Sequence, residues 1–167
     1  MKLSVIYDSR TGNTKRCAEW IAEGMGRVAG VEAKTFSTKE VDEAFVKDSA
    51  GVVIGSPSYY ALMTADMRTW LLEGAPKLSL GGKLGGAFAT VQYTHGGGDL
   101  VIQSILTNLI TIGMLCYSGG GACGDPCIHL GPVAVNHNVE KACLEDFQEN
   151  FQTFGERFAK KAKELFG

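Results

Sequence analysis

Short apolar runs alternate along the chain with longer stretches in which apolar residues recur every three or four positions. The runs predict strands and the periodic stretches predict helices. The predicted strands cover residues 2–7, 31–36, 51–55 and 84–91, with a fifth that starts near Met114, is interrupted by a loop over residues 118–127 and resumes over residues 129–135. The predicted helices cover residues 12–28, 39–45, 64–73, 100–112 and 139–166. This alternation predicts an α/β fold, an open parallel sheet with helices on both faces.

Three loops of this predicted sheet leave the carboxyl ends of strands, at residues 8–14, 55–63 and 90–99. Ligands of open parallel sheets bind beyond those ends, where the strand order reverses. All three loops carry unusual residues, so we expect them to converge on one site.

The first loop gathers hydroxyl and amide groups at the start of a helix. It reads Ser9-Arg10-Thr11-Gly12-Asn13-Thr14 and directly follows the first predicted strand. Backbone N–H groups and hydroxyls at the positive end of a helix bind a phosphate monoester without a metal. The alternative is an ordinary N-cap with polar turn residues, but a cap needs only one such residue.

Other phosphate-binding loops fit this segment poorly. Neither G-x-x-x-x-G-K-[ST] nor G-x-G-x-x-G follows the first strand, which disfavours an ATP-type P-loop and a dinucleotide fingerprint. A metal-dependent phosphoacceptor site needs clustered acids, whereas Asp8 stands alone at the end of this strand.

The second and third loops offer aromatic rings and glycines. Pro57, Ser58, Tyr59 and Tyr60 follow a buried strand, and aromatic side chains at a ligand edge can cover a planar ring. The alternative for these tyrosines is that one packs on the next helix and the other lies on the surface. The third loop, Thr90-Val91-Gln92-Tyr93-Thr94-His95-Gly96-Gly97-Gly98-Asp99, adds a further stacking candidate in Tyr93 and glycines that permit unusual dihedral angles.

The three loops, in this order and at these spacings, resemble those of the flavodoxin superfamily. S-x-T-G-N-T is similar to the flavodoxin loop that binds the 5′-phosphate of FMN. The segments G-S-P-S-Y-Y and T-V-Q-Y-T-H-G-G-G-D more closely resemble the NAD(P)H:quinone reductase branch, in which a G-T-P-type loop and a G-G-G-containing loop flank the flavin. The resemblance covers nearly the whole chain. It implies one FMN-binding domain over residues 1–167, a three-layer sandwich with a five-stranded parallel sheet in the order 2-1-3-4-5.

The resemblance also assigns expected roles in FMN binding. The phosphate would contact Ser9, Arg10, Thr11, Gly12, Asn13 and Thr14. One edge of the isoalloxazine would lie against Pro57, Ser58, Tyr59 and Tyr60. The opposite edge and the pyrimidine oxygens would lie against Thr90, Val91, Gln92 and Tyr93, with Gly96 and Gly97 closing the turn.

The function implied first is an FMN-dependent NAD(P)H oxidoreductase that reduces quinones or similar small acceptors by two electrons. The flavin supplies this chemistry, so no side chain is predicted to be catalytic. The alternative is a flavodoxin-type electron carrier between partner proteins, and a third reading is a non-catalytic flavin-binding or partner-binding module. Two departures weigh against the carrier: no glycine follows Gly55 before the next helix begins, and the net charge of −2 is small for such carriers.

Composition adds little that is specific. Hydrophobic residues make up 45% and charged residues 20% of the 167, which is typical of a globular protein. The small net charge does not indicate a nucleic-acid or membrane partner. No secretory signal or membrane-spanning run is recognised, and five cysteines are present, so a cytoplasmic location with reduced thiols is expected. The expected partner is a small-molecule electron acceptor or a redox protein, and the chain is a candidate homo-oligomer.

A cysteine-rich segment invites a metal hypothesis. Cys123 and Cys127 stand four positions apart, with Cys116 and His129 nearby, but this spacing is not that of common zinc sites and no metal is predicted. The preferred interpretation is a glycine-rich loop with incidental thiols, and a redox-active thiol pair near the flavin is the alternative. His95 is interpreted as a solvated loop histidine, with a proton-donor role as the alternative.

Overall fold

A computed structural model describes residues 1–137 and 140–167 of the chain. This part of the chain contains one parallel sheet in the order β2-β1-β3-β4-β5, with β6 also paired to β4. The strands are β1 (Lys2–Tyr7), β2 (Glu32–Ser37), β3 (Ser49–Pro57), β4 (Leu84–Val91), β5 (Leu115–Cys116) and β6 (Val133–Val135). The predicted α/β fold and strand order are confirmed.

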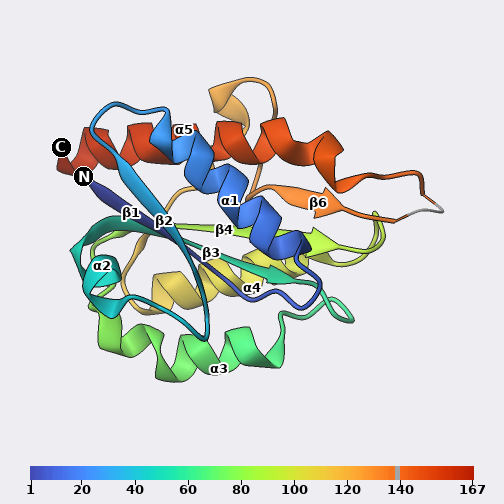
Figure 1. The fold of residues 1–167 in the computed structure, drawn as a ribbon, viewed down its shortest axis with the longest axis horizontal. Coiled ribbons are helices and arrows are strands. Elements are labelled where there is room, and N and C mark those ends of the chain that lie inside the picture. The colour runs from blue at the N-terminus through green and yellow to red at the C-terminus, as the bar shows by residue number, and fades with distance from the viewer. Residues whose placement is uncertain (138–139) are drawn as a thin grey trace.

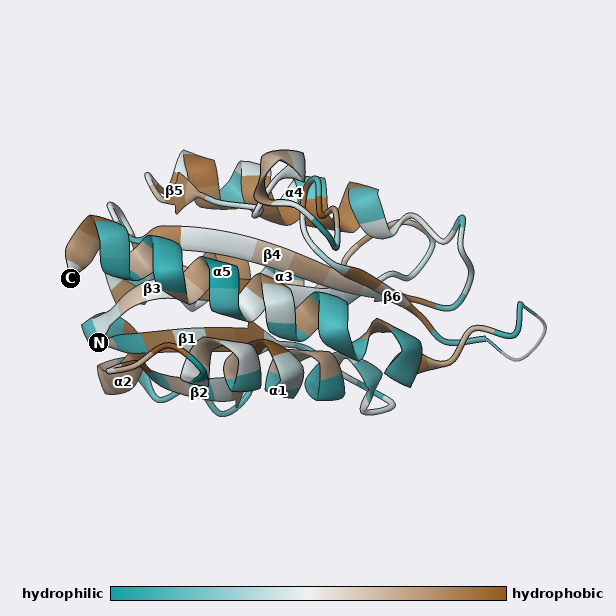
Figure 2. Cartoon of the chain, turned by 90° about the horizontal axis from the view of Figure 1, so that it is seen from above, coloured by the Kyte–Doolittle hydropathy of each residue, from teal (hydrophilic) through white to brown (hydrophobic). Residues whose placement is uncertain are grey.

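Helices cover both faces of the sheet (Figure 1). On one face α1 (Asn13–Gly26) and α5 (Gln148–Phe166) enclose a core that includes Trp20, Phe151 and Phe158. On the other face lie α2 (Glu43–Asp48), α3 (Ala65–Glu73) and α4 (Gly98–Thr111). Figure 2 shows the apolar colouring of the central strands between these helices. Short 3₁₀ turns occur at Ala75–Leu78, Gly121–Cys123 and Leu144–Phe147.

The edge of the sheet beside β4 is split. β5 pairs with Leu84 and Gly85 at the start of β4, and β6 pairs with Ala89, Thr90 and Val91 at its end. The predicted interruption is therefore confirmed, although the strand resumes at Val133 rather than at residue 129. The intervening segment, residues 117–132, contributes the buried side chain of Ile128 to the core on the α5 side.

Two helices begin later than their periodicity predicts. The predicted helix over residues 39–45 is α2 at Glu43–Asp48, because the carboxylate of Asp42 caps it by accepting the N–H of Phe45 at 3.0 Å. The predicted last helix starts at Val139, which lies outside the described residues. The chain from residue 140 to Leu144 forms turns and a 3₁₀ start, in which the Cys143 N–H donates to the Asp146 carboxylate, and α5 begins at Gln148.

None of the helices in the described part of the chain combines the length and the apolar character that a membrane crossing requires.

Candidate functional site

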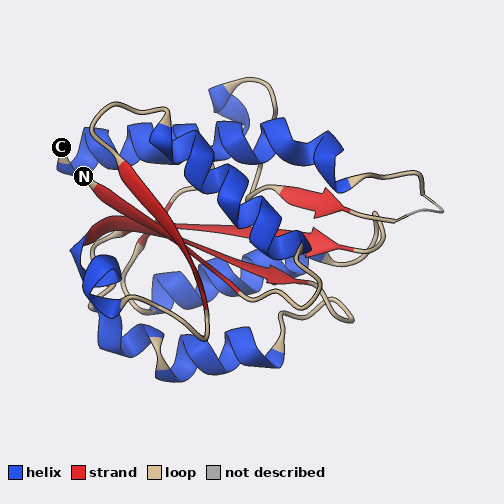
Figure 3. Ribbon diagram, viewed as in Figure 1, coloured by secondary structure: helices blue, strands red, loops and turns tan. Residues whose placement is uncertain are grey.

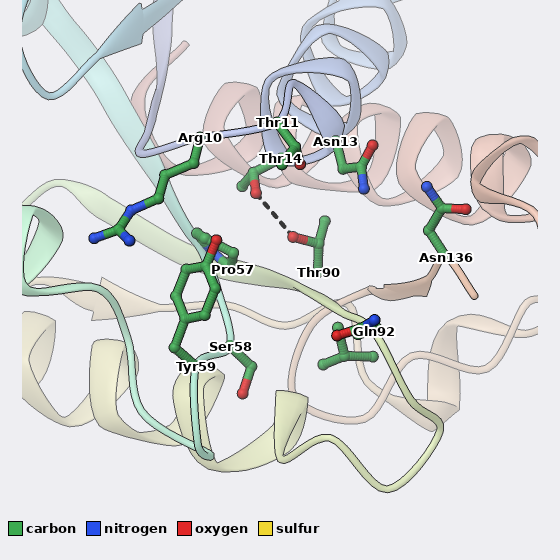
Figure 4. A pocket seen from close by; sticks show the side chains of 11 residues that line it. Arg10, Thr11, Asn13, Thr14, Pro57, Ser58, Tyr59, Thr90, Gln92 and Asn136 are labelled. Carbon is green, nitrogen blue, oxygen red and sulfur yellow. Dashed lines mark hydrogen bonds between the residues drawn. The ribbon is translucent and has the colours of Figure 1, made fainter. Parts of the chain in front are cut away.

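The strands β3, β4 and β6 point their carboxyl ends toward the same edge of the sheet (Figure 3). The loops that leave this edge enclose a cavity of about 510 Å³, which is within the range of small-molecule sites. Its lining residues come from four segments (Figure 4): Arg10, Thr11, Asn13, Thr14, Pro57, Ser58, Tyr59, Thr90, Val91, Gln92 and Asn136. The three predicted loops therefore converge on one site, as parallel strand geometry requires.

The start of α1 forms one wall of this cavity. Gly12 occupies the N-cap in a left-handed conformation (φ 94°), and within the described residues no side chain caps the helix. The first turn carries no acid and includes two basic residues, Lys15 and Arg16. The amide groups at this helix start thus remain available for a ligand, and the helix dipole favours an anion there.

Hydroxyl groups of the first and third loops meet behind these amides. The Thr14 and Thr90 hydroxyls lie 2.8 Å apart and both residues are buried (Figure 4). Ser9 does not line the cavity. Its Oγ accepts the Gly12 N–H at 3.1 Å and so stabilises the turn of the first loop. A phosphate monoester fits this donor-rich, uncapped helix start.

The second loop is a tight hairpin. Tyr59 and Leu62 exchange both backbone hydrogen bonds, and the two central residues, Tyr60 and Ala61, have positive φ angles of 53° and 62°. The Tyr59 ring lines the cavity, with the Arg10 guanidinium 5.1 Å from its centre. Tyr60 is fully exposed at the turn and does not line the cavity in this structure, and its contact with the isoalloxazine stays a prediction.

The third loop is packed against the second. The Ser58 hydroxyl donates to the Gly96 carbonyl at 2.6 Å, and the Ser58 N–H donates to the Thr90 carbonyl at 2.8 Å. A Cβ on Gly97 would lie 2.4 Å from the Cβ of Ala61, so the hairpin can approach only a glycine here. Gly96 and Gly97, like Gly12, therefore shape the site without lining the cavity.

The segment after β6 adds a wall that the three loop motifs do not reveal. Asn136 lines the cavity, and its N–H donates to the Val91 carbonyl at 3.1 Å. The His137 ring packs against Tyr93 in a tilted arrangement, with centroids 4.5 Å apart and an interplanar angle of 53°, and Tyr93 does not line the cavity. His95 is exposed to solvent, as interpreted from the sequence.

A carboxylate ties this segment to the third loop. Glu140 Oε2 accepts both the N–H and the hydroxyl of Thr94, at 2.8 and 2.7 Å. These hydrogen bonds hold the pKa of the Glu140 carboxyl below its usual value. The carboxylate thereby fixes the backbone two residues beyond Gln92, which lines the cavity.

The fold and the cavity are those of a doubly wound α/β protein with the start of α1 at its ligand edge. Comparison with known proteins identifies the family. The flavodoxin family model matches residues 5–101. A flavodoxin from Clostridium saccharobutylicum is 43% identical over 99% of this chain and the whole of its own length. The chain belongs to the flavodoxin family.

More distant relatives include an enzyme. An NAD(P)H dehydrogenase (quinone) from Aromatoleum aromaticum is 30% identical, over 69% of each chain. Among solved structures, a flavodoxin from the domain Archaea superposes with a TM-score of 0.76 over 98% of this chain and 99% of its own, at 23% identity, which supports the fold alone. These comparisons favour the carrier alternative over the quinone reductase that the loop motifs favoured.

Proposed function

We propose that this chain is an FMN-binding electron-transfer protein that exchanges electrons with redox partner proteins. The observation that carries the proposal is end-to-end similarity to a flavodoxin at 43% identity, combined with an uncapped helix start on the cavity wall. The quinone dehydrogenase relatives are 28% and 30% identical and align with about two thirds of the chain.

The cavity residues fit FMN by their chemistry. Thr11, Asn13 and Thr14 with the amides of the α1 start would hold the phosphate, and the Tyr59 ring would cover the isoalloxazine. Backbone groups of Thr90, Val91 and Gln92 would meet the polar edge of the ring. FMN when bound supplies the electron-storing chemistry, and the protein supplies binding, orientation and exclusion of water.

The rim of the cavity suits brief contact with another protein. Tyr60 and Leu62 project from the hairpin, Tyr60 fully exposed and Leu62 69% exposed, and Tyr93 is 49% exposed. Exposed apolar groups that gather at a ligand edge mark interaction surfaces. A docked redox partner would thus meet the cofactor edge directly.

The test is anaerobic reduction of the FMN-loaded protein, followed by flavin absorbance. A carrier is expected to stay oxidised with NADH or NADPH alone and to bleach when a catalytic amount of an NADPH-dependent flavoprotein reductase is added. Rapid bleaching by nucleotide alone, with turnover on a quinone, would instead establish the reductase. Protein that takes up no FMN would overturn both readings.

Replacing Glu140 with glutamine is expected to weaken FMN binding roughly threefold to tenfold at neutral pH, because a neutral amide accepts the Thr94 hydrogen bonds less strongly. The pKa of Glu140 is lowered in the folded protein. As pH falls through that lowered value, protonation makes the Glu140 carboxyl as neutral as the glutamine amide, and the difference between the two proteins disappears. Titrations of both proteins should show their affinities converge in acid. A constant affinity ratio across that range would contradict the assignment.

A further inference from the structure

The segment between β5 and β6 is held against α5 by one arginine. Arg157 donates from Nη1 to the carbonyl of Pro126 at 2.8 Å, and from Nη2 to the carbonyls of Gly124 and Asp125 at 3.1 and 2.8 Å. These three hydrogen bonds fix the turn over residues 124–126. The residues that line the proposed FMN cavity come from other segments.

Two exposed thiols flank this fixed turn, Cys123 on one side and Cys127 on the other. The Cys127 sulfur lies 3.4 Å from the position that a Cβ on Gly121 would occupy, and Gly121 opens the 3₁₀ turn that ends at Cys123. Cys127 therefore packs toward the turn that carries the other thiol.

Each thiol has a polar neighbour suited to thiol chemistry. The Cys127 sulfur lies 3.3 Å from His129 Nε2, which is placed to accept the thiol proton. The Cys123 sulfur lies 3.6 Å from the Tyr117 hydroxyl. Burial and this hydrogen bond raise the pKa of Tyr117 to about 12, so the phenol stays neutral and keeps its proton to donate.

We propose that Cys123 and Cys127 form a thiol–disulfide exchange site, with Cys127 as the attacking thiol and Cys123 as the resolving thiol. The site takes low-molecular-weight disulfides. A metal site is disfavoured, because no group of three suitable His, Cys, Asp or Glu ligands occurs among the described residues. The matched family model ends at residue 101, before this segment.

The exchange balances with a small disulfide as the oxidant. His129 accepts the Cys127 proton, and the thiolate attacks one sulfur of the small disulfide, whose S–S bond breaks. The departing thiolate takes up a proton, which leaves a mixed disulfide on Cys127. Cys123 then loses its proton and attacks the Cys127 sulfur, releasing the second small thiol. Two protein thiols are oxidised to one disulfide, and one small disulfide is reduced to two thiols.

The other cysteines are internal comparators. Burial raises the pKa of the Cys17 and Cys116 thiols. The Cys143 thiol donates to the Glu145 carboxylate, which raises its pKa. Each therefore has less thiolate at neutral pH than an unperturbed thiol, and we expect each to react more slowly than Cys127.

The first experiment incubates the full-length protein with oxidised glutathione, alkylates the remaining thiols and maps the peptides by mass spectrometry. The expected product is a Cys123–Cys127 disulfide with Cys116 and Cys143 alkylated. Cys123→Ser should stop at a glutathione adduct on Cys127, whereas Cys143→Ser should behave as wild type. Iodoacetamide should label Cys127 on the order of tenfold faster than Cys143. Equal labelling, or adducts without an internal disulfide, would overturn the proposal, as would stoichiometric zinc that protects both thiols.

A second experiment tests the role of the fixed turn. Arg157→Gln removes the three donated hydrogen bonds and is expected to lower the equilibrium constant for disulfide formation about tenfold in glutathione buffers, since the turn between the two cysteines is then no longer fixed and closing the loop costs more entropy. Lys160→Gln is the matched control, because Lys160 lies on the same helix and pairs with Glu156. The same constant for both variants would show that the arginine does not organise the pair.

Discussion

Replacing Thr11 with aspartate is expected to weaken FMN binding at least a hundredfold while leaving riboflavin binding nearly unchanged. Thr11 lines the cavity at the start of α1, where its side chain is exposed and the first helical turn carries no acid. A carboxylate placed about 4–6 Å from the FMN phosphate would oppose binding by roughly 3 kcal/mol at an effective dielectric constant near 20, which is about a hundredfold in affinity.

The same carboxylate should not harm the free protein. An acid near a helix N-terminus interacts favourably with the helix dipole, by about 0.3–1 kcal/mol, so the FMN-free variant should melt at the wild-type temperature or slightly above it. Flavin affinities follow from fluorescence titration of the apoprotein, with Thr11→Asn as the uncharged control of similar shape. Equal losses for FMN and riboflavin would mean that the substitution distorts the cavity, and an unaffected FMN affinity would place the phosphate elsewhere.

The convergence of the three loops could be predicted because it follows from topology. Parallel strands end at a common edge, so Thr14 and Thr90, 76 positions apart, were expected near each other and share a hydrogen bond. The cavity wall that is formed by the segment after β6 could not be predicted in the same way. Asn136 follows a three-residue strand after an irregular segment, and Glu140 reaches Thr94 across 46 positions without a motif.

The first residues of α2 and α5 could not be predicted for a different reason. The hydrophobic periodicity of the sequence indicates which residues face the core. The first residue of a helix depends instead on which side chain accepts hydrogen bonds from its free amides. Asp42 decides this for α2, and the bond between the Cys143 N–H and Asp146 does so just before α5.

The missing glycine of the second loop misled the functional prediction. Its absence weighed against a carrier, because electron-carrier flavodoxins often have a glycine next to an aromatic in this loop, where a peptide can flip to bond the flavin. The chain makes the turn with Tyr60 and Ala61 instead, and Gly97 of the third loop leaves room for Ala61. The hairpin therefore forms without a glycine of its own, which the amino-acid composition of this loop does not reveal.

Replacing Gly24 with alanine is expected to lower the free energy of unfolding by about 3 kcal/mol, near the upper end for overpacking. A Cβ on Gly24 would lie 1.9 Å from the backbone oxygen of Gln152 on α5, and one on Gly155 would lie 2.1 Å from the backbone oxygen of Ile21 on α1. The two helices thus meet backbone to backbone at a pair of glycines, and a methyl group can be fitted only by separating them. Urea unfolding of the apoprotein measures the loss.

Gly26→Ala is the matched control within the same helix. No described neighbouring group lies within 4 Å of a Cβ at this position. Gly26 is the last residue of α1, so alanine should leave the stability unchanged or raise it by at most about 0.5 kcal/mol through its higher helix propensity. A loss at Gly24 without a loss at Gly26, two positions further along α1, would assign the effect to contact with α5. Because α1 begins at the cavity, its displacement by Gly24→Ala should also weaken FMN binding. Equal losses of stability at both positions would show instead that α1 and α5 separate at little cost. The start of α1 would then be positioned by its own loop rather than by α5.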